Sequence, residues 1–229
     1  MASEKSKSEV ETELKIKLSH EDLEKVFKSL TKMDGASEVS HKFRPRMYYD
    51  TLDLQLYKNK ISLRVQYKKG KNGNLGGYEQ TVKVELQPDS RLGTGILLRK
   101  ECKNGVKSHQ PELASVVDPV AQDALKPFQN KTLVHIFTAA MERRSFDWEL
   151  KNGGNRGVVE VAFDVGQLIL PQNNAHEDFA EIEVEIKSGG GEFIEIVKNE
   201  ILKIAPSAKI QSLSKSEQGS LFYLKHHKK

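Results

Sequence analysis

The stretch EVETELKIKL, residues 9–18, alternates charged and mainly apolar side chains from end to end. One set consists of Glu9, Glu11, Glu13, Lys15 and Lys17, and the other of Val10, Thr12, Leu14, Ile16 and Leu18. Because a β-strand turns successive side chains to opposite faces, this pattern predicts a strand with one charged and one mainly apolar face.

Similar strand patterns recur along the chain, at 43–50, 61–67, 78–86, 95–102, 141–150, 157–165, 180–187 and, less clearly, 209–213. Helical patterns lie between some of them, at 19–33, 111–128 and 189–206. Pro119 falls inside the second helical pattern, where we expect it to bend or break the helix. This mixture predicts an α+β fold rich in antiparallel strands.

The polar faces of these predicted strands carry full charges, and each strand tends to carry one sign. Acidic positions are Glu160, Glu181, Glu183 and Glu185, and basic positions are Arg64, Lys83, Arg99 and Arg143. A row of carboxylates suits Mg²⁺ or Mn²⁺, and a facing row of bases suits phosphate oxygens. The other interpretation is a solvated sheet face with cross-strand ion pairs, and alternation alone favours that interpretation.

Composition limits the classes of protein further. The 229 residues, 37% hydrophobic and 30% charged, fit one large domain or two small ones. No apolar run could span a membrane, and the N-terminal MASEKSKSE resembles no secretory signal, so we expect no membrane partner. One cysteine, Cys102, favours a reducing compartment such as the cytoplasm. We expect a flexible N-terminus at 1–8, one domain at 9–224 and a basic tail at 225–229.

The order of the charged motifs resembles the CYTH superfamily, also called the triphosphate tunnel metalloenzymes, over residues 9–224. The motifs are ETELK (11–15), YYDTLDLQL (48–56), LRVQ (63–66), EQTVK (79–83), RKE (99–101), RRSF (143–146), VEVAFDVGQL (159–168), AEIEVEI (180–186) and LSKSEQG (213–219). The resemblance implies an eight-stranded antiparallel β-barrel, open at both ends, with helices packed outside. The charged strand faces would then line the bore.

The resemblance also implies roles for individual residues. The metal ligands, for Mg²⁺ or Mn²⁺, would be Glu11, Glu13, Glu160, Glu181, Glu183 and Glu185. The substrate-binding residues would be Lys15, Arg64, Lys83, Arg99, Arg143 and Lys215, and the catalytic set would be Glu11, Glu13, Lys15, Arg64, Lys83 and Arg143. Arg143 is preferred to Arg144 because it lies on the face opposite Phe146 and Trp148. One departure is Gln66, where the family often has a second arginine in the form L-R-x-R.

The activity that the resemblance implies is metal-dependent hydrolysis of a triphosphate, with inorganic triphosphate as the first choice. Alternatives are a class IV adenylate cyclase, a thiamine triphosphatase and a non-catalytic polyphosphate-binding module. The expected partner is a small-molecule triphosphate or polyphosphate. Nucleic acid is not expected as a partner, and the oligomeric state stays open.

Overall fold

The computed structural model describes residues 7–69, 75–87 and 95–227. Its strands are β1 (Lys7–Lys17), β2 (Ser40–Asp50), β3 (Ile61–Lys69), β4 (Leu75–Glu85), β5 (Ile96–Val106), β6 (Val134–Asn152), β7 (Asn155–Ile169), β8 (His176–Ser188) and β9 (Lys209–Ile210). Its α-helices are α1 (His20–Leu30), α2 (Gln55–Lys58), α3 (Pro119–Leu125), α4 (Glu192–Ile204) and α5 (Lys215–His226). Short 3₁₀ turns lie at Leu113–Ser115 and Lys126–Phe128.

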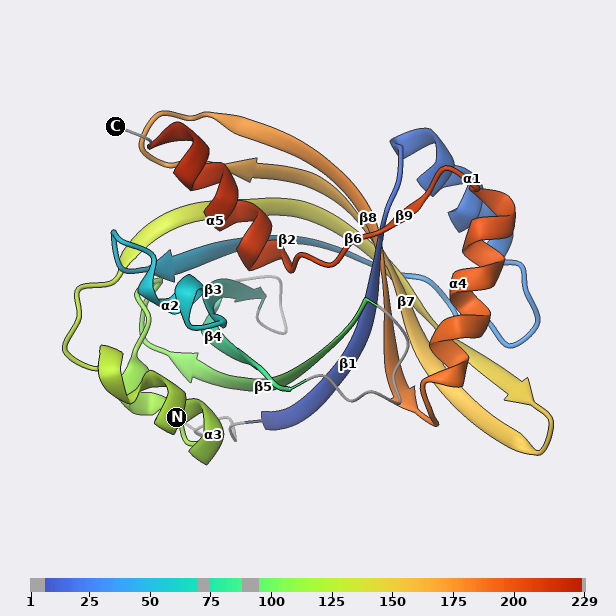
Figure 1. Ribbon diagram of the computed structural model, residues 1–229, viewed down its shortest axis with the longest axis horizontal. Coiled ribbons are helices and arrows are strands. Elements are labelled where there is room, and N and C mark those ends of the chain that lie inside the picture. Colours follow the sequence, from blue (N-terminus) through green and yellow to red (C-terminus); the bar gives the residue numbers. More distant parts are fainter. Residues whose placement is uncertain (1–6, 70–74, 88–94, 228–229) are drawn as a thin grey trace.

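Strands β1 to β8 form a closed antiparallel barrel (Figure 1). Their order is β5-β4-β3-β2-β6-β7-β8-β1, and β1 closes the ring by pairing with β5, with Glu11 opposite Arg99. Strand β9 adds a short extra pairing to β1 at Ile16. The predicted eight-stranded barrel with helices outside is therefore confirmed.

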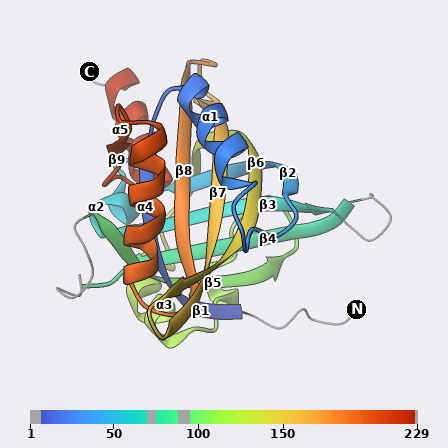
Figure 2. The same cartoon turned by 90° about the vertical axis from the view of Figure 1, so that its right-hand side faces the viewer.

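The apolar strand faces point outward and are covered by helices. Helices α1 and α4 lie side by side over β7 and β8 (Figure 2), where Leu23, Val26 and Ile194 are buried against Leu14 and other strand residues. The remaining outer surface is covered by α3 and, on another side, by α5 (Figure 1). Because the outside takes up the apolar faces, the charged faces point to the interior. The solvated face that alternation alone favours is thus not what the chain forms.

Local signals explain where two helices begin. Helix α1 starts after Ser19, whose hydroxyl accepts a hydrogen bond from the backbone N–H of Asp22 at 3.1 Å. Helix α3 starts at Pro119, after Asp118 accepts from the backbone N–H of Ala121 at 3.0 Å. The expectation that Pro119 breaks the helical pattern at 111–128 is confirmed, because that stretch divides into a 3₁₀ turn at Leu113–Ser115 and α3, which begins at Pro119. A proline in the first helical turn removes only an N–H that has no partner there.

The two ends of the chain differ from their expected boundaries. Residues 1–6 and 228–229 of the expected flexible ends lie outside the described residues. Lys7 and Ser8 already belong to β1, and the Ser8 hydroxyl donates to Asp118 at 2.6 Å. At the other end, Lys225 and His226 form the last turn of α5 rather than a tail. None of the helices within the described residues is long and apolar enough to span a membrane.

Candidate active site

A polar cavity of about 800 Å³ lies inside the barrel. Residues from all eight barrel strands and the first turn of α5 line it, and most of them are charged. We call it the central cavity. Three residues of the opening stretch show how far the charged faces are removed from water, since Glu11 is 7%, Glu13 1% and Lys15 2% exposed.

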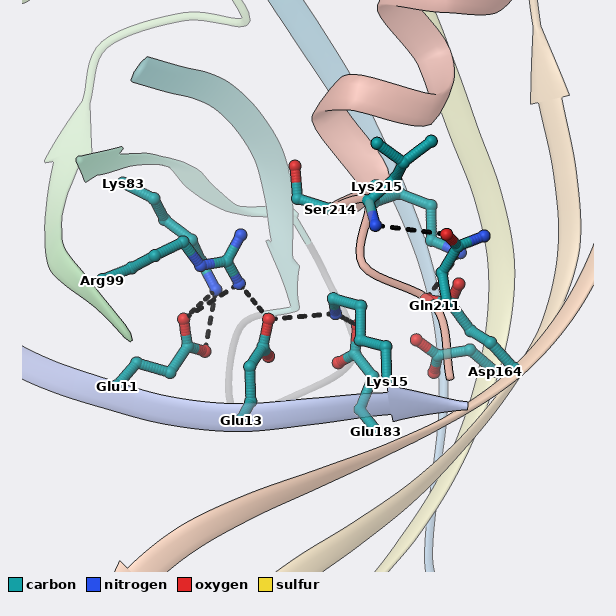
Figure 3. Close-up of polar contacts among 12 residues, drawn as sticks. Glu11, Glu13, Lys15, Lys83, Arg99, Asp164, Glu183, Gln211, Ser214 and Lys215 are labelled. Atoms are coloured by element: carbon teal, nitrogen blue, oxygen red, sulfur yellow. Dashed lines mark hydrogen bonds and ion pairs between the residues drawn. The ribbon is translucent and has the colours of Figure 1, made fainter. Parts of the chain in front are cut away.

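Glu11 lies between two bases from neighbouring strands (Figure 3). Lys83 of β4 donates to both of its carboxylate oxygens, at 2.7 and 2.6 Å, and Arg99 of β5 donates at 3.2 Å. Burial alone would raise the pKa of Glu11, but Lys83 and Arg99 outweigh it and lower that pKa to about 2. Arg99 also donates to Glu13, so the two acids of β1 share one guanidinium.

Lys15 joins the acids of β1 to those of β8. Its ammonium lies 3.1 Å from Glu13 and also contacts Glu183, which faces it across the β1–β8 pairing. Burial lowers the pKa of Lys15, but the carboxylates of Glu13 and Glu183 outweigh burial, so the pKa is raised overall. Lys15 is therefore a charged residue held in place from two sides.

Asp164, Glu181 and Glu183 form a buried acidic cluster in which one carboxylate oxygen from each lies within 4.8 Å of the others. Asp164 faces Glu181 across the β7–β8 pairing, and Arg143 donates to Asp164 at 2.7 and 2.6 Å and to Glu183. Lys215, at the start of α5, lies 2.8 Å from Glu181. Three hard oxygen donors at this spacing fit Mg²⁺ or Mn²⁺.

The structure groups only part of the predicted metal ligands. Glu181 and Glu183 belong to the acidic cluster, whereas Glu11 and Glu13 are paired with bases. Glu160 and Glu185 form a separate group on Lys187, at 3.0 and 2.7 Å. Burial, followed by the charge of Glu11, raises the pKa of Glu185. Metal binding by these six residues stays a prediction.

All six predicted substrate-binding residues line the central cavity, namely Lys15, Arg64, Lys83, Arg99, Arg143 and Lys215. Arg144, the rejected neighbour of Arg143, lies outside the barrel. Its guanidinium is 4.0 Å from the centre of the Phe27 ring and pairs with Glu24 of α1. Alternation along β6 therefore turns Arg143 into the barrel and Arg144 to its outer face.

Sequence reasoning missed several residues of the central cavity. Asp164 belongs to the acidic cluster, and Glu101 lies 3.0 Å from Lys83 and 3.7 Å from Arg64. Burial raises the pKa of Glu101, but Lys83 and Arg64 outweigh it and the pKa is lowered overall. Both acids stand on polar strand faces that the alternation pattern already marks.

Two cavity residues on β2, Arg44 and Arg46, were also missed. The repeat of Arg44, Arg46 and Tyr48 at every second position was the available signal. Burial and the nearby Arg64 and Arg143 lower the pKa of Arg46 to about 10, so Arg46 is still a cation at neutral pH.

Comparisons with known proteins agree with this architecture. The family model of the CYTH domain matches residues 9–220. A "putative adenylate cyclase" from Bacillus halodurans shares the fold with a TM-score of 0.53 and 19% identity, over 92% of this chain and 97% of that one. A Hippeastrum putative adenylyl cyclase, described as having a dominant triphosphatase activity, has a TM-score of 0.52 and 13% identity, over 90% of this chain and 92% of that one.

No curated protein matches the sequence significantly. The two structural neighbours share so little identity that they speak for the fold alone. The family model, in contrast, covers nearly the whole barrel, from the charged strand β1 to the first turns of α5. The chain therefore belongs to the CYTH family.

Proposed function

We propose that this protein hydrolyses a triphosphate in a metal-dependent reaction inside the central cavity, with inorganic triphosphate as the substrate. The observation that carries the proposal is the buried acidic cluster of Asp164, Glu181 and Glu183, which is bordered by a cavity lined with bases. Such a site offers oxygen ligands to a divalent cation and cationic donors to a polyanion.

Different groups of residues would have different roles in this reaction. Arg64, Lys83 and Arg99 would bind phosphoryl oxygens, and their fixed positions would hold the triphosphate in one orientation. Arg143, on the acidic cluster, would stabilise charge that develops on the phosphoryl group under attack. The chemistry that a bound Mg²⁺ or Mn²⁺ supplies is Lewis-acid polarisation of the phosphoryl oxygens. Asp164, Glu181 and Glu183 would hold that ion.

The barrel itself contributes through its low dielectric. Arg64, Lys83 and Arg99 are only 9%, 8% and 7% exposed, so competition from water is weak and each ionic contact is strong. We also propose a cytoplasmic location, because the sequence contains one cysteine, Cys102, and one cysteine cannot form a disulfide within the chain.

The test measures phosphate and pyrophosphate release from tripolyphosphate, ATP and thiamine triphosphate, with Mg²⁺, Mn²⁺ or EDTA. We expect hydrolysis of tripolyphosphate that EDTA abolishes. Glu181→Gln, in the acidic cluster, should lower kcat by about 100-fold or more. Glu177→Gln is the matched control, since Glu177 is an exposed carboxylate on the same strand.

The other outcomes of the same assay are distinct. Cyclic AMP and pyrophosphate from ATP would identify a cyclase, the activity named for the Bacillus halodurans neighbour. Preferred cleavage of thiamine triphosphate would move the substrate to an organic triphosphate. Tight tripolyphosphate binding without turnover of any of the three compounds would refute the enzyme and leave a polyphosphate-binding module.

A further inference from the structure

Arg46 is a buried cation without a partner. It is 4% exposed and lines the central cavity from β2. Among the residues that the structure describes it forms no ion pair, and its Nε atom has no hydrogen-bond partner. A buried guanidinium in this state destabilises the folded protein, because lost hydration is not replaced. Its retention calls for a ligand that the chain itself does not contain.

The other buried bases of the cavity each have a carboxylate partner. Lys83 and Arg99 contact Glu11, and Arg143 contacts Asp164. Even Arg64, the next arginine along the barrel wall, has Glu101 at 3.7 Å. The Nε atoms of Arg64 and Arg99 also lack a hydrogen-bond partner, but an incoming anion would have to displace a carboxylate from each of those two guanidinium groups. Arg46, among the described residues, has no carboxylate to displace.

Arg46 also lies directly opposite Gln66 in the β2–β3 pairing. Side chains at paired positions start only about 5 Å apart, so they extend into the same part of the cavity. The Gln66 amide nitrogen donates to Glu79 at 2.8 Å, which fixes this neutral side chain on the neighbouring strand. At this pair of positions the positive charge therefore comes from Arg46 on β2. Arg64, two residues before Gln66 on β3, lines the same cavity.

We propose that Arg46 is a phosphate-binding residue that acts with Arg64 to hold one phosphoryl group. The identity of the anion as a triphosphate rests on the proposed function, but the site for a multiply charged anion rests on the geometry of Arg46. A guanidinium without an ion pair suits phosphate, because it can donate two parallel hydrogen bonds. Glu183 of the acidic cluster lines the same cavity as Arg46, so the bound group would lie in the cavity that this cluster borders.

The test measures the Kd of tripolyphosphate by calorimetry in EDTA, so that binding is read without turnover. Arg46→Gln should raise the Kd by about tenfold to hundredfold, the effect of losing a charged hydrogen bond. Its thermal midpoint without anion should equal or exceed that of the wild type, because an unpartnered buried charge is gone. Arg46→Lys should fall between the two in affinity. Arg144→Gln, outside the barrel, is the control for loss of one arginine.

A double variant, Arg46→Gln with Gln66→Arg, returns the charge from the opposite strand and should recover part of the lost affinity. Wild-type affinity in Arg46→Gln would overturn the proposal. A lower midpoint without anion, together with no recovery in the double variant, would also overturn it by showing a structural role. If these binding results hold while no substrate is hydrolysed, only the proposed function fails.

Discussion

Replacing Lys15 with methionine tests whether the interior charges hold the barrel together. Lys15 lies 3.1 Å from Glu13 and contacts Glu183, and all three are buried. At an effective dielectric constant of about 20, a pair at that separation is worth about 5 kcal/mol. Removal of one partner of a buried pair typically costs about 3–5 kcal/mol. Arg99 still contacts Glu13 and Arg143 still contacts Glu183 in the variant, so the lower end of this range, about 3 kcal/mol, applies. We expect Lys15→Met to lower the free energy of unfolding by that amount at neutral pH.

The pH dependence of this loss separates charge from packing. In the variant, the carboxylates of Glu13 and Glu183 lose the ammonium between them, and protonation of a carboxylate on acidification relieves the resulting repulsion. The difference from the wild type should therefore shrink on mild acidification. Urea unfolding at several pH values measures it, and Lys17→Met is the control because Lys17 is the exposed lysine two residues further along β1. A loss that does not change with pH, or one no larger than that of the control, would refute the reasoning.

Two further predictions concern stability in acid and the packing of α5 against the barrel. The pKa of Glu11 falls from 4.5 to about 2 on folding, so its stabilising contribution, about 3 kcal/mol, is present above pH 4.5 and is lost as the pH falls toward 2. In Glu11→Gln the free energy of unfolding should change less over that range, and a slope as steep as that of the wild type would contradict the assignment. Gly219 of α5 has no room for a side chain, because a Cβ there would overlap the Phe137 ring. Gly219→Ala should destabilise the protein by about 1–3 kcal/mol. Because Lys215 lies one turn earlier in α5, the same variant should also bind tripolyphosphate more weakly in calorimetry. An unchanged melting midpoint would contradict this by showing that α5 can shift freely.

The sequence was sufficient for the strands and for the barrel, but not for every helix. Alternation marks the strands, and the order of the charged motifs identifies the family. Helix α5 was missed although Ser214 and Glu217 form a capping box, because its apolar stripe is weak and the motif around Lys215 was considered only for phosphate binding. Alternation also cannot tell a solvated face from an interior one, since both carry charged residues at every second position.

The partners of the site residues were harder to predict for a physical reason. Which base contacts Glu11 depends on the register between β1 and β5. The paired residues Glu11 and Arg99 lie 88 positions apart in the sequence. A shift of that register by one residue would turn every side chain of one strand to the other face. Arg46 is a different case, because its signal, the alternation of Arg44, Arg46 and Tyr48 along β2, is present in the sequence.

The interior charges form one continuous chain of contacts across the barrel. In order, its members are Lys83, Glu11, Arg99, Glu13, Lys15, Glu183, Arg143 and Asp164. Acids and bases alternate in this chain, so each of its charges lies next to an opposite one. A triphosphate can bind its bases only by replacing carboxylates, and the released carboxylates then need another cation. Anion and divalent cation should therefore strengthen each other's binding by the same factor, as linkage requires. Arg46 stands outside this chain, so an anion can contact it before any of these pairs is broken.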